Sequence, residues 1–517
     1  MSLNILWIDD EIDLLAPYEI FLNKKGYNTF FFNNAADALE KSNLMEINLI
    51  LLDETMPGMS GLEALSKIKE INPLIPVIMV TKNEEEGLME EAIGSHISDY
   101  LIKPINPNQV LLSIKKITEK DKLITNQSIL DYQREFRSLS IQISEANSYE
   151  DWEAIYKKIT HWELRLENIS DENMLEILIN QKNEANQLFS EFIEDNYKEL
   201  IIEKPENPIL SHKAFKHFVK PHLKKDEKVL LLMIDNLRYD QWLVIKPLFT
   251  QFYNISEESI YMSLLPSVTQ YARNAFFAGL SPFEIHKKFP EKWFFDYEEE
   301  NKNIYEKEFL SNQLKMLNLN DLSSAYHKVL NASFEQKLLD TFHTYKNNNL
   351  VTIVYNFVDI LSHAKTNNEI VNELVRDDKT FRSITKTWFE NADIMKIVQK
   401  AAENKMKLIV TTDHGTIFVK DNIEIIGDRE SSTNIRYKTG RNLNYNKAKN
   451  LFSIDDPEKY LLPKSNVSSK YVFAKEDYFF TYPKNQNHYV NYYTNTYQHG
   501  GISLEELLIP ISVFNPK

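Results

Sequence analysis

Asp413 and His414 are adjacent residues of types that can bind a metal ion. They follow the apolar and β-branched run 408–412, which predicts a buried strand, and Gly415 comes next. An acid and an imidazole at the carboxyl end of such a strand suit a divalent cation such as zinc or manganese. Asp-His-Gly also makes a good turn, so a metal site requires further ligands from elsewhere in the chain.

Further candidate ligands occur in three other segments. Asp235 directly follows the strand-like run 229–234. Asp359 and His363 are four residues apart, so they lie on one face of a helical turn and can bind one cation. His499 precedes two glycines in a predicted loop. Together with Asp413 and His414, these side chains supply enough oxygen and nitrogen ligands for two metal ions.

Thr269 is the candidate nucleophile. It lies at the start of the helical pattern 271–278, where a hydroxyl is most often an N-cap. The same position also directs backbone N–H groups toward a bound phosphate. Two neighbouring cations can bind the attacking and leaving oxygens of an in-line phosphoryl displacement. A metal would also lower the pKa of the Thr269 hydroxyl and make its alkoxide a usable nucleophile.

A second set of polar residues lies at predicted strand ends in the first 120 residues. Asp9 and Asp10 follow the first strand pattern, Asp53 ends the third, Thr81 ends the fourth and Lys103 follows the fifth. Three clustered carboxylates repel one another unless a hard cation such as Mg²⁺ lies among them. The lysine and the hydroxyl supply the other contacts that a phosphoryl group needs.

Alternating strand and helix patterns predict how these residues are positioned. The predicted strands are 5–8, 29–32, 49–52, 77–80 and 100–102, and the predicted helices are 14–25, 61–70, 86–94 and 107–120. Such alternation predicts right-handed βαβ units and a parallel sheet, with its site at the carboxyl ends of the strands.

The segment from 121 to 204 has no strand pattern and no glycine. Its apolar periodicity predicts helices at about 124–145, 149–168 and 171–200, and a proline-containing linker follows at 204–208. Two interpretations stay open: a spacer that carries a signal or pairs with a second chain, and a bundle that packs within one chain. No convincing helix-turn-helix or basic recognition helix is found, so direct DNA binding is the minority hypothesis.

Composition limits the classes of function. A chain of 517 residues is expected to hold two to four domains. The net charge of -16 argues against a broad nucleic-acid-coating surface, and the absence of cysteine excludes disulfides and thiolate sites. The sequence lacks a signal-peptide pattern, and no run reaches 18 apolar residues. We therefore expect a cytoplasmic protein without a membrane span.

The first 120 residues resemble the receiver domain of two-component response regulators. The motifs that carry the resemblance are Ile8-Asp9-Asp10-Glu11, Leu51-Leu52-Asp53 with Met56-Pro57-Gly58, Val80-Thr81, and Tyr100 with Lys103-Pro104. The resemblance implies a flavodoxin-like (βα)5 fold in which Asp53 accepts a phosphoryl group and Asp9, Asp10 and Asp53 hold Mg²⁺. It also implies a cis Lys103–Pro104 bond and three further roles: Thr81 and Lys103 bind the acyl phosphate, and Tyr100 is the aromatic switch.

Residues 208–517 resemble the alkaline phosphatase superfamily, most closely its PglZ branch. The motifs are Asp235-Asn236-Leu237-Arg238, Pro266-Ser267-Val268-Thr269, Asp359 to His363, Thr412-Asp413-His414-Gly415 and His499-Gly500-Gly501. The resemblance implies an α/β domain with two zinc ions. One zinc would be held by Asp235, Thr269, Asp413 and His414, and the other by Asp359, His363 and His499.

The same resemblance implies that Thr269 forms a covalent phospho-enzyme intermediate. A threonine nucleophile is typical of the superfamily's phosphodiesterases, whereas the sulfatase branch needs a cysteine or serine signature that this chain lacks. The phosphate-binding asparagine or arginine has no clear match, and the candidates are Arg273, Asn274, Arg436 and Arg441. The region 283–348 is expected to cap the site and set substrate choice.

The whole chain resembles PorX-type response regulators, with a receiver at 1–120, a central helical bundle at 121–207 and a PglZ domain at 208–517. The resemblance implies a partner histidine kinase, a phosphorylation-linked homodimer, and a phosphodiesterase for short linear or cyclic oligonucleotides. It also implies a link to type IX secretion and gliding motility. The alternative is a non-enzymatic adaptor, in which the metal domain is structural and the phosphorylated protein binds a transcription or secretion partner.

Overall fold

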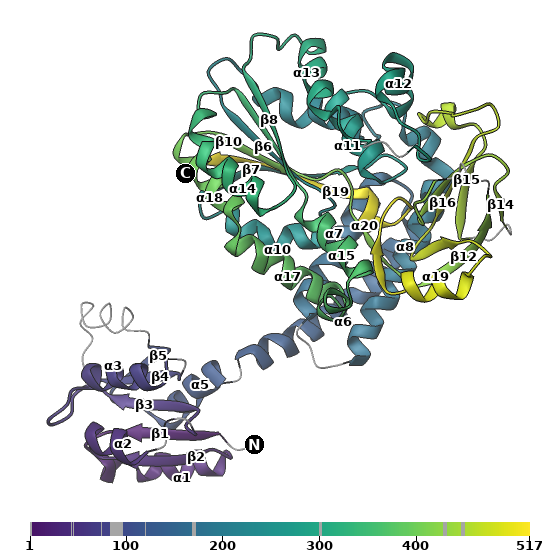
Figure 1. Cartoon of the computed structure of the whole chain (residues 1–517). Coiled ribbons are helices and arrows are strands. Elements are labelled where there is room, and N and C mark those ends of the chain that lie inside the picture. The colour runs from purple at the N-terminus through teal and green to yellow at the C-terminus, as the bar shows by residue number, and fades with distance from the viewer. Residues whose placement is uncertain are drawn as a thin grey trace. The chain divides into compact units, whose positions relative to one another are not determined.

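The computed structural model describes residues 3–42, 44, 46–73, 75–82, 97–118, 120–167, 172–298, 302–427, 432–445 and 450–517. The chain divides into two compact units, Met1–Asp131 and Tyr132–Lys517, and each is described by itself. Figure 1 shows their helices and strands. The predicted helix at 86–94 lies outside the described residues.

The first unit contains a five-stranded parallel sheet of order β2-β1-β3-β4-β5. Its strands are β1 Asn4–Ile8, β2 Asn28–Phe32, β3 Leu49–Asp53, β4 Val77–Thr81 and β5 Asp99–Ile102. All five strands were predicted, and β1, β3 and β4 carry the continuous apolar runs that strands buried on both faces require. This strand order is that of flavodoxin-like folds, so the predicted fold is confirmed.

Helices cover both faces of this sheet. Residues of α2 (Ala35–Lys41) and α3 (Gly61–Ile71) enter the core on one face, and residues of α1 (Ala16–Lys24) and α5 (Pro107–Thr118) enter the core on the other. Helix α2 was not predicted. It begins after Asn34, whose side chain accepts a hydrogen bond from the Asp37 N–H.

The second unit is built on a six-stranded sheet of order β7-β19-β10-β6-β9-β8. Its strands are β6 Val229–Ile234, β7 Tyr253–Met262, β8 Ser324–Val329, β9 Leu350–Tyr355, β10 Lys407–Thr411 and β19 Leu508–Pro516. Strands β10, β6, β9 and β8 are parallel, whereas β19 is antiparallel to β10 and β7 is antiparallel to β19. The carboxyl ends of β6, β9 and β10 therefore meet at one edge of the sheet.

Helices position the ends of these strands. One face of the sheet is covered by α10 (Tyr239–Phe249), α17 (Asp378–Asn391) and α18 (Asp393–Glu403), whose apolar residues share one core with β6, β9 and β10. Helix α11 (Thr269–Ala278) packs against α9 (Ser211–Ala214) and α13 (Glu306–Met316).

Small β-sheets lie between β10 and the end of the chain, and the sequence patterns did not predict them. Their orders are β14-β12-β17, β13-β16-β15 and β11-β18. Their strands are β11 Ile417–Val419, β12 Asp421–Ile426, β13 Tyr437–Gly440, β14 Asn444–Tyr445, β15 Leu451–Ile454, β16 Lys470–Ala474, β17 Tyr478–Thr481 and β18 Thr496–Gln498. The helix α19 (Gln486–Tyr493) connects β17 to β18. These segments border the edge of the main sheet where the parallel strands end (Figure 1).

Three long helices form the middle of the chain, as predicted: α6 Lys120–Glu145, α7 Tyr149–Leu166 and α8 Glu172–Leu200. Helices α7 and α8 pack within the second unit instead of forming a separate spacer. The ring of Tyr156 lies 5.7 Å from that of Tyr239, and the Tyr149 hydroxyl donates to the Ile260 carbonyl at 3.3 Å. Within the described residues, no helix combines the length and apolar character needed to cross a membrane.

Candidate functional site

The carboxylates of Asp9, Asp10 and Asp53 form a cluster at the carboxyl ends of β1 and β3. One oxygen from each lies within 4.8 Å of the others. The Lys103 Nζ atom lies 2.9 Å from Asp9 Oδ2 and 3.0 Å from Asp53 Oδ2, so the lysine partly neutralises the cluster. The Lys103–Pro104 bond is cis, as the resemblance implied. The structure thus brings together the acids and the lysine that the sequence placed at separate strand ends.

The electrostatics of this cluster suit a cation or a phosphoryl group. Burial raises the pKa of the Asp53 carboxyl, the neighbouring Asp9 charge adds to this, and the ion pair with Lys103 opposes it. Burial disfavours the charged form of Lys103, but its hydrogen bonds to Asp9 and Asp53 raise its pKa overall. The hydroxyl of Thr81 donates to the Glu54 carboxylate, and Tyr100 is 41% exposed.

In the second unit, Asp235, Asp413 and His414 form the Asp413 cluster. All three are buried, and one ligand atom from each lies within 4.8 Å of the others. The Nδ1 atom of His414 lies 3.1 Å from the Gly415 carbonyl. Because a carbonyl only accepts, Nδ1 carries a proton, and the Nε2 atom faces the two acids at 3.8 and 3.7 Å.

Thr269 directs its hydroxyl into the Asp413 cluster. Its Oγ1 atom lies 3.3 Å from Asp235 Oδ1 and 3.1 Å from His414 Nε2. Thr269 is the first residue of α11, and the residue at the N-cap position is Val268, which makes no side-chain cap. The prediction that Thr269 is an N-cap is therefore wrong. Its hydroxyl does not bond to the start of the helix and can take part in a reaction.

Asp359, His363 and His499 form the His499 cluster beside the first. One ligand atom from each lies within 4.8 Å of the others, and Asp359 and His363 share one face of α15 (Phe357–Asn367). The ring of His499 stacks on that of His414 with centroids 4.3 Å apart. The two clusters are therefore adjacent, as a pair of metals acting on one phosphoryl group requires.

Asn236 connects the two clusters. Its backbone N–H donates to Asp413 Oδ1 at 3.3 Å, and its side-chain amide donates to Asp359 Oδ1 at 3.4 Å. The residue adopts a positive φ of 64°, a conformation that asparagine tolerates better than most residues. This role was not predicted, although Asn236 lies within the motif that was.

Buried polar atoms without partners indicate that cations fit these clusters. Asp413 Oδ2 has no hydrogen-bond partner within the described structure, and an unpaired buried polar atom is costly, while His499 turns its Nε2 atom toward Asp359 Oδ1 at 3.8 Å. Burial and the charge of Asp235 raise the pKa of Asp413 to about 6. Burial and Asp235 likewise raise the pKa of Asp359. Divalent cations would satisfy these atoms and remove the repulsion, and the mixed oxygen and nitrogen donors suit zinc.

Arg273 orients Asp235 and is not free to bind a phosphate. Its Nη1 atom lies 2.5 Å from Asp235 Oδ2, and its Nε atom lies 2.6 Å from Glu306 Oε1. Asn356 also donates to Asp235 Oδ2, at 2.8 Å. The Oδ1 atom of Asp235 is thereby turned toward Thr269.

The other three candidates for phosphate binding differ in their surroundings. Arg436 is buried and paired with Glu506 at 2.6 Å. Asn274 accepts a hydrogen bond from the side chain of Asn303 at 3.3 Å. Arg441 is exposed. None of the three lines the cleft described next.

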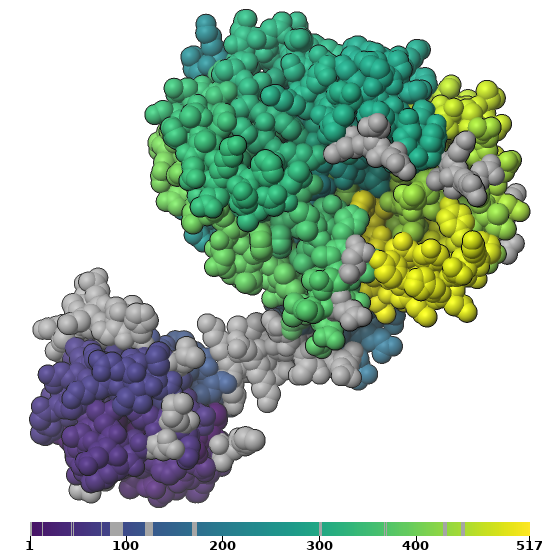
Figure 2. All heavy atoms as spheres, in the orientation of Figure 1, coloured from purple at the N-terminus to yellow at the C-terminus, as the bar shows by residue number. Residues whose placement is uncertain are grey.

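A cleft of about 480 Å³ opens onto Thr269 and the His499 cluster and is lined by Thr269, His363 and His499. In Figure 2 the surface is hollowed between the green segments and the yellow C-terminal segments. Lys302 and Asn303 also line the cleft, and they come from the region predicted to cap the site. The Asn303 amide donates to the Thr269 carbonyl at 3.2 Å. Neither residue was predicted, because no strand or helix pattern marks their loop.

Gly415 is required by close packing beside the Asp413 cluster. A Cβ atom at this position would lie 1.9 Å from the Glu505 carbonyl oxygen of α20 (Leu504–Leu507). The glycine therefore lets α20 approach the strand end that carries Asp413 and His414. Close packing against α20, and not a turn, therefore explains why a glycine follows Asp413 and His414.

Helix α8 holds the loops that carry Thr269 and His499. The Tyr197 hydroxyl accepts from the Leu265 N–H at 2.9 Å, four residues before Thr269. The Asn186 side chain accepts from the Leu504 N–H at 2.8 Å, five residues after His499. The helical segment is thus part of the scaffold of the site.

Lys182 on α8 lies among three carboxylates, and its side chain is 12% exposed. Its Nζ atom is 2.8 Å from Glu163, 3.3 Å from Asp378 and 2.8 Å from Glu505. Lys182→Met would leave these buried acids without their shared cation. We expect it to lower the free energy of unfolding by about 3–5 kcal/mol.

Denaturant unfolding followed by tryptophan fluorescence measures this effect. Lys198→Met, at an exposed position of the same helix, is the matched control and is expected to change stability by less than about 0.5 kcal/mol. Equal midpoints for the two variants would show that Lys182 does not join α8 to the domain.

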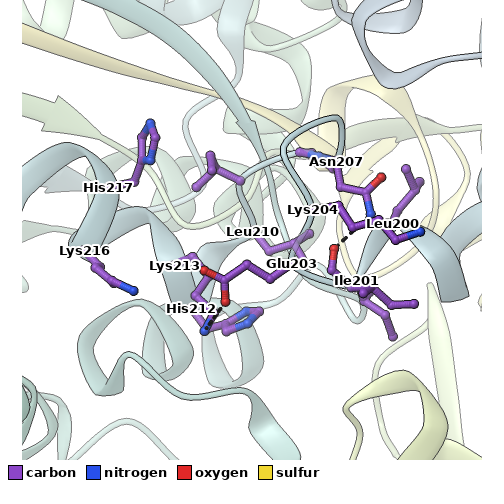
Figure 3. A pocket seen from close by; sticks show the side chains of 13 residues that line it. Leu200, Ile201, Glu203, Lys204, Asn207, Leu210, His212, Lys213, Lys216 and His217 are labelled. Atoms are coloured by element: carbon purple, nitrogen blue, oxygen red, sulfur yellow. Dashed lines mark hydrogen bonds and ion pairs between the residues drawn. The ribbon is translucent and has the colours of Figure 1, made fainter.

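A separate cavity of about 230 Å³ lies between the end of α8 and α9 (Figure 3). It is lined by several lysines, but Lys213 is paired with Glu203 at 3.2 Å and Lys204 lies 3.5 Å from Glu199. The carbonyl end of α8 also disfavours an anion there. We assign no function to this cavity.

Three family models match successive parts of the chain. A model described as the response regulator receiver domain matches residues 5–115. One described as the PorX response regulator linker domain matches residues 122–201. One described as the BREX system PglZ alkaline phosphatase-like domain matches residues 214–514, which is more than half of the chain.

Curated relatives match about a quarter of the chain. The transcriptional regulatory protein ZraR of Klebsiella oxytoca is 34% identical over 122 residues, which is 24% of this chain and 28% of that protein. The transcriptional regulatory protein SrrA of Staphylococcus aureus is 29% identical over 144 residues, 27% of this chain and 59% of that protein. The chain therefore spans less than two thirds of the length of either.

Solved structures match the same part of the chain. The chemotaxis protein CheY4 of Vibrio cholerae is 23% identical, with a TM-score of 0.22, over 23% of this chain and 99% of that chain. A CheY-like receiver domain protein of Methanospirillum hungatei is 27% identical, with a TM-score of 0.22, over 23% of this chain and 96% of that chain.

Proposed function

Because the chain belongs to the PglZ alkaline phosphatase-like family and has the domain order of PorX-type response regulators, we propose that its C-terminal domain is a two-metal phosphodiesterase controlled by phosphorylation of Asp53. The observation that carries the proposal is the position of the Thr269 hydroxyl, 3.1 Å from His414 Nε2 and facing two adjacent ligand clusters. A closed structural metal site has no need of such a hydroxyl.

In the proposed reaction, Thr269 Oγ1 attacks the phosphorus of a diester bound in the cleft. A bond forms between Oγ1 and phosphorus, the bond to the leaving alcohol breaks, and the hydroxyl proton passes to solvent or to the alcohol. Water then attacks the phosphothreonine, the bond between Oγ1 and phosphorus breaks, a proton returns to Oγ1, and a monoester is released. Zinc ions at the two clusters would lower the pKa of the hydroxyl and stabilise charge on the phosphoryl oxygens.

The protein's own residues would orient this reaction. Arg273 and Asn356 fix the Asp235 carboxylate so that one oxygen faces Thr269. We propose Lys302 as the phosphate contact, because it lines the cleft, whereas the Asn303 amide already donates to the Thr269 carbonyl and to Asn274 Oδ1. A hydrogen bond from its ammonium group favours the charge that develops on the phosphoryl oxygens.

For the receiver, we propose that a sensor histidine kinase phosphorylates Asp53 with Mg²⁺ held by Asp9, Asp10 and Asp53. The position of Lys103 between Asp9 and Asp53 supports this, because an ammonium group there can bind a phosphoryl oxygen. We further propose that phosphorylation links two copies of the chain. The proposals of short oligonucleotides as substrates and of a role in type IX secretion rest on the resemblance alone, and the proposed cytoplasmic location rests on the lack of a signal-peptide pattern.

Metal removal tests the enzyme proposal. We expect dialysis against a chelator to abolish turnover of bis-(p-nitrophenyl) phosphate and added zinc to restore it, because the two clusters bind metal only through their own side chains. His363→Ala is expected to reduce bound zinc from two ions to one per chain, measured by elemental analysis.

His217→Ala, at an exposed histidine outside the clusters, is the matched control and should retain both ions. Zinc-loaded native protein that turns over no phosphodiester would instead favour the adaptor alternative. Native protein that binds no zinc would contradict both proposals for the metal site.

A further inference from the structure

A cavity of about 570 Å³ lies where helix α8 meets the start of α17 and the strand β11. It shares no lining residue with the cleft beside Thr269. A volume of this size is typical of pockets that bind small molecules. The cavity is therefore a candidate binding site that is separate from the proposed reaction centre.

Apolar side chains form one part of the wall of this cavity. Leu178 and Ile179 come from α8, and Ile417 and Phe418 come from β11. Ile179 is 51% exposed, so its side chain is not covered by the core of the domain. These side chains can bury the apolar part of a ligand, which favours binding in proportion to the area removed from water.

Acids outnumber bases around the cavity. Eight of the lining residues are acids and four are bases, so the walls carry a net negative charge. An anionic ligand would be repelled and a cationic ligand attracted. Each of the four bases already has a partner: Lys182 bonds to Glu163, Arg382 and Lys379 bond to Glu167, and Lys420 bonds to Asp477.

Two acids of the wall, Asp421 and Glu476, have no ion-pair partner among the described residues. Burial raises the pKa of the Glu476 carboxyl, and the neighbouring Asp477 charge adds to this. Burial likewise raises the pKa of Glu163, although Lys182 lies 2.8 Å away. The cavity is therefore short of positive charge, and a bound cation would stabilise the ionised form of these carboxyls.

We infer that this cavity binds a small organic cation, in which an amine, guanidine or amidine group is carried on an apolar body. The charged group would pair with Glu476 or Asp421, and charge-assisted hydrogen bonds are about twice as strong as neutral ones. The apolar body would contact Leu178, Ile179 and Phe418. Binding here does not depend on the proposed phosphodiesterase activity, because the cavity and the cleft have no residue in common.

Three probes with the same ring test the inference by calorimetric titration of the full chain: cationic benzamidine, neutral benzamide and anionic benzoate. We expect benzamide to bind at least about 10-fold more weakly than benzamidine, because the charge-assisted pair is lost, and benzoate not to bind. Acetamidine has the charge without the ring and should also bind more weakly, because it buries less apolar surface.

The variant Glu476→Gln locates the bound probe. It removes the charge and keeps the size of the side chain, and we expect it to weaken benzamidine binding about 5-fold. Glu424→Gln is the matched control, because Glu424 is exposed on β12 and does not line the cavity. It should leave the affinity unchanged.

Three results would overturn the inference. Benzamidine that does not bind, or that binds no better than benzamide, would show that the cavity does not recognise a cation. Equal affinities in Glu476→Gln and Glu424→Gln would place the bound probe elsewhere. A blocked arginine tripeptide that binds more tightly than benzamidine would assign the cavity to a side chain of a partner protein instead of a small molecule.

Discussion

Thr269→Ala is expected to reduce phosphodiester turnover by at least about 10³-fold while both metal clusters keep their ions. In comparable hydrolases, loss of the nucleophile costs up to about 10⁶ in kcat. The hydroxyl is 3.3 Å from Asp235 and 3.1 Å from His414, and alanine places no oxygen at that position. The measurement is kcat/KM for the zinc-loaded protein.

Two controls make this result specific. Thr269→Ser restores an oxygen at the same place and is expected to recover most of the activity, whereas a purely structural role for the threonine would leave the serine and alanine variants alike. Zinc content measured on all three proteins separates loss of the nucleophile from loss of the metal. Full activity in Thr269→Ala would refute the covalent mechanism.

Asp53→Asn is expected to abolish phosphoryl transfer from acetyl phosphate to the protein. Asp53 ends β3 beside Asp9 and Lys103, and an amide there cannot form an acyl phosphate. The measurement is incorporation of radiolabelled phosphate in the presence of Mg²⁺. Asp37→Asn is the matched control, because Asp37 is an acid of the same unit that pairs with Lys41 away from the cluster.

The same variants test whether phosphorylation links two copies of the chain. We expect beryllofluoride with Mg²⁺ to increase the molar mass of native protein and of Asp37→Asn, measured by light scattering, and to leave Asp53→Asn unchanged. Labelling of Asp37→Asn but not of Asp53→Asn would identify the acceptor. A native protein that is labelled without any change of mass would contradict the dimer while retaining Asp53 as the acceptor.

The sequence by itself determined which side chains meet at the two sites. Asp9, Asp53, Asp235 and Asp413 each stand at the end of a run apolar enough to be a buried parallel strand, and parallel strands place their carboxyl ends at one edge. In a parallel sheet, a polar residue at the end of a strand therefore lies at a predictable place. The four-residue spacing of Asp359 and His363 likewise predicts that both side chains lie on one face of a helix.

Only the tertiary structure decided what those side chains bond to. Arg273 was a candidate for the phosphate, but it pairs with Asp235 and Glu306, which are distant from each other in the sequence. The Thr269 hydroxyl faces His414 and does not cap its helix. A pattern shows that a residue is polar and near a helix end, but competing partners from other segments settle its hydrogen bonds.

The tertiary structure also decided the walls of the cleft and the role of the helical segment. Lys302, Asn303 and Tyr492 come from a loop and a short exposed helix, which have no apolar periodicity to read. The apolar stripes of α7 and α8 were visible in the sequence, but periodicity shows only that a face is buried. What covers that face depends on long-range packing, and here it is the domain that carries Thr269 and His499.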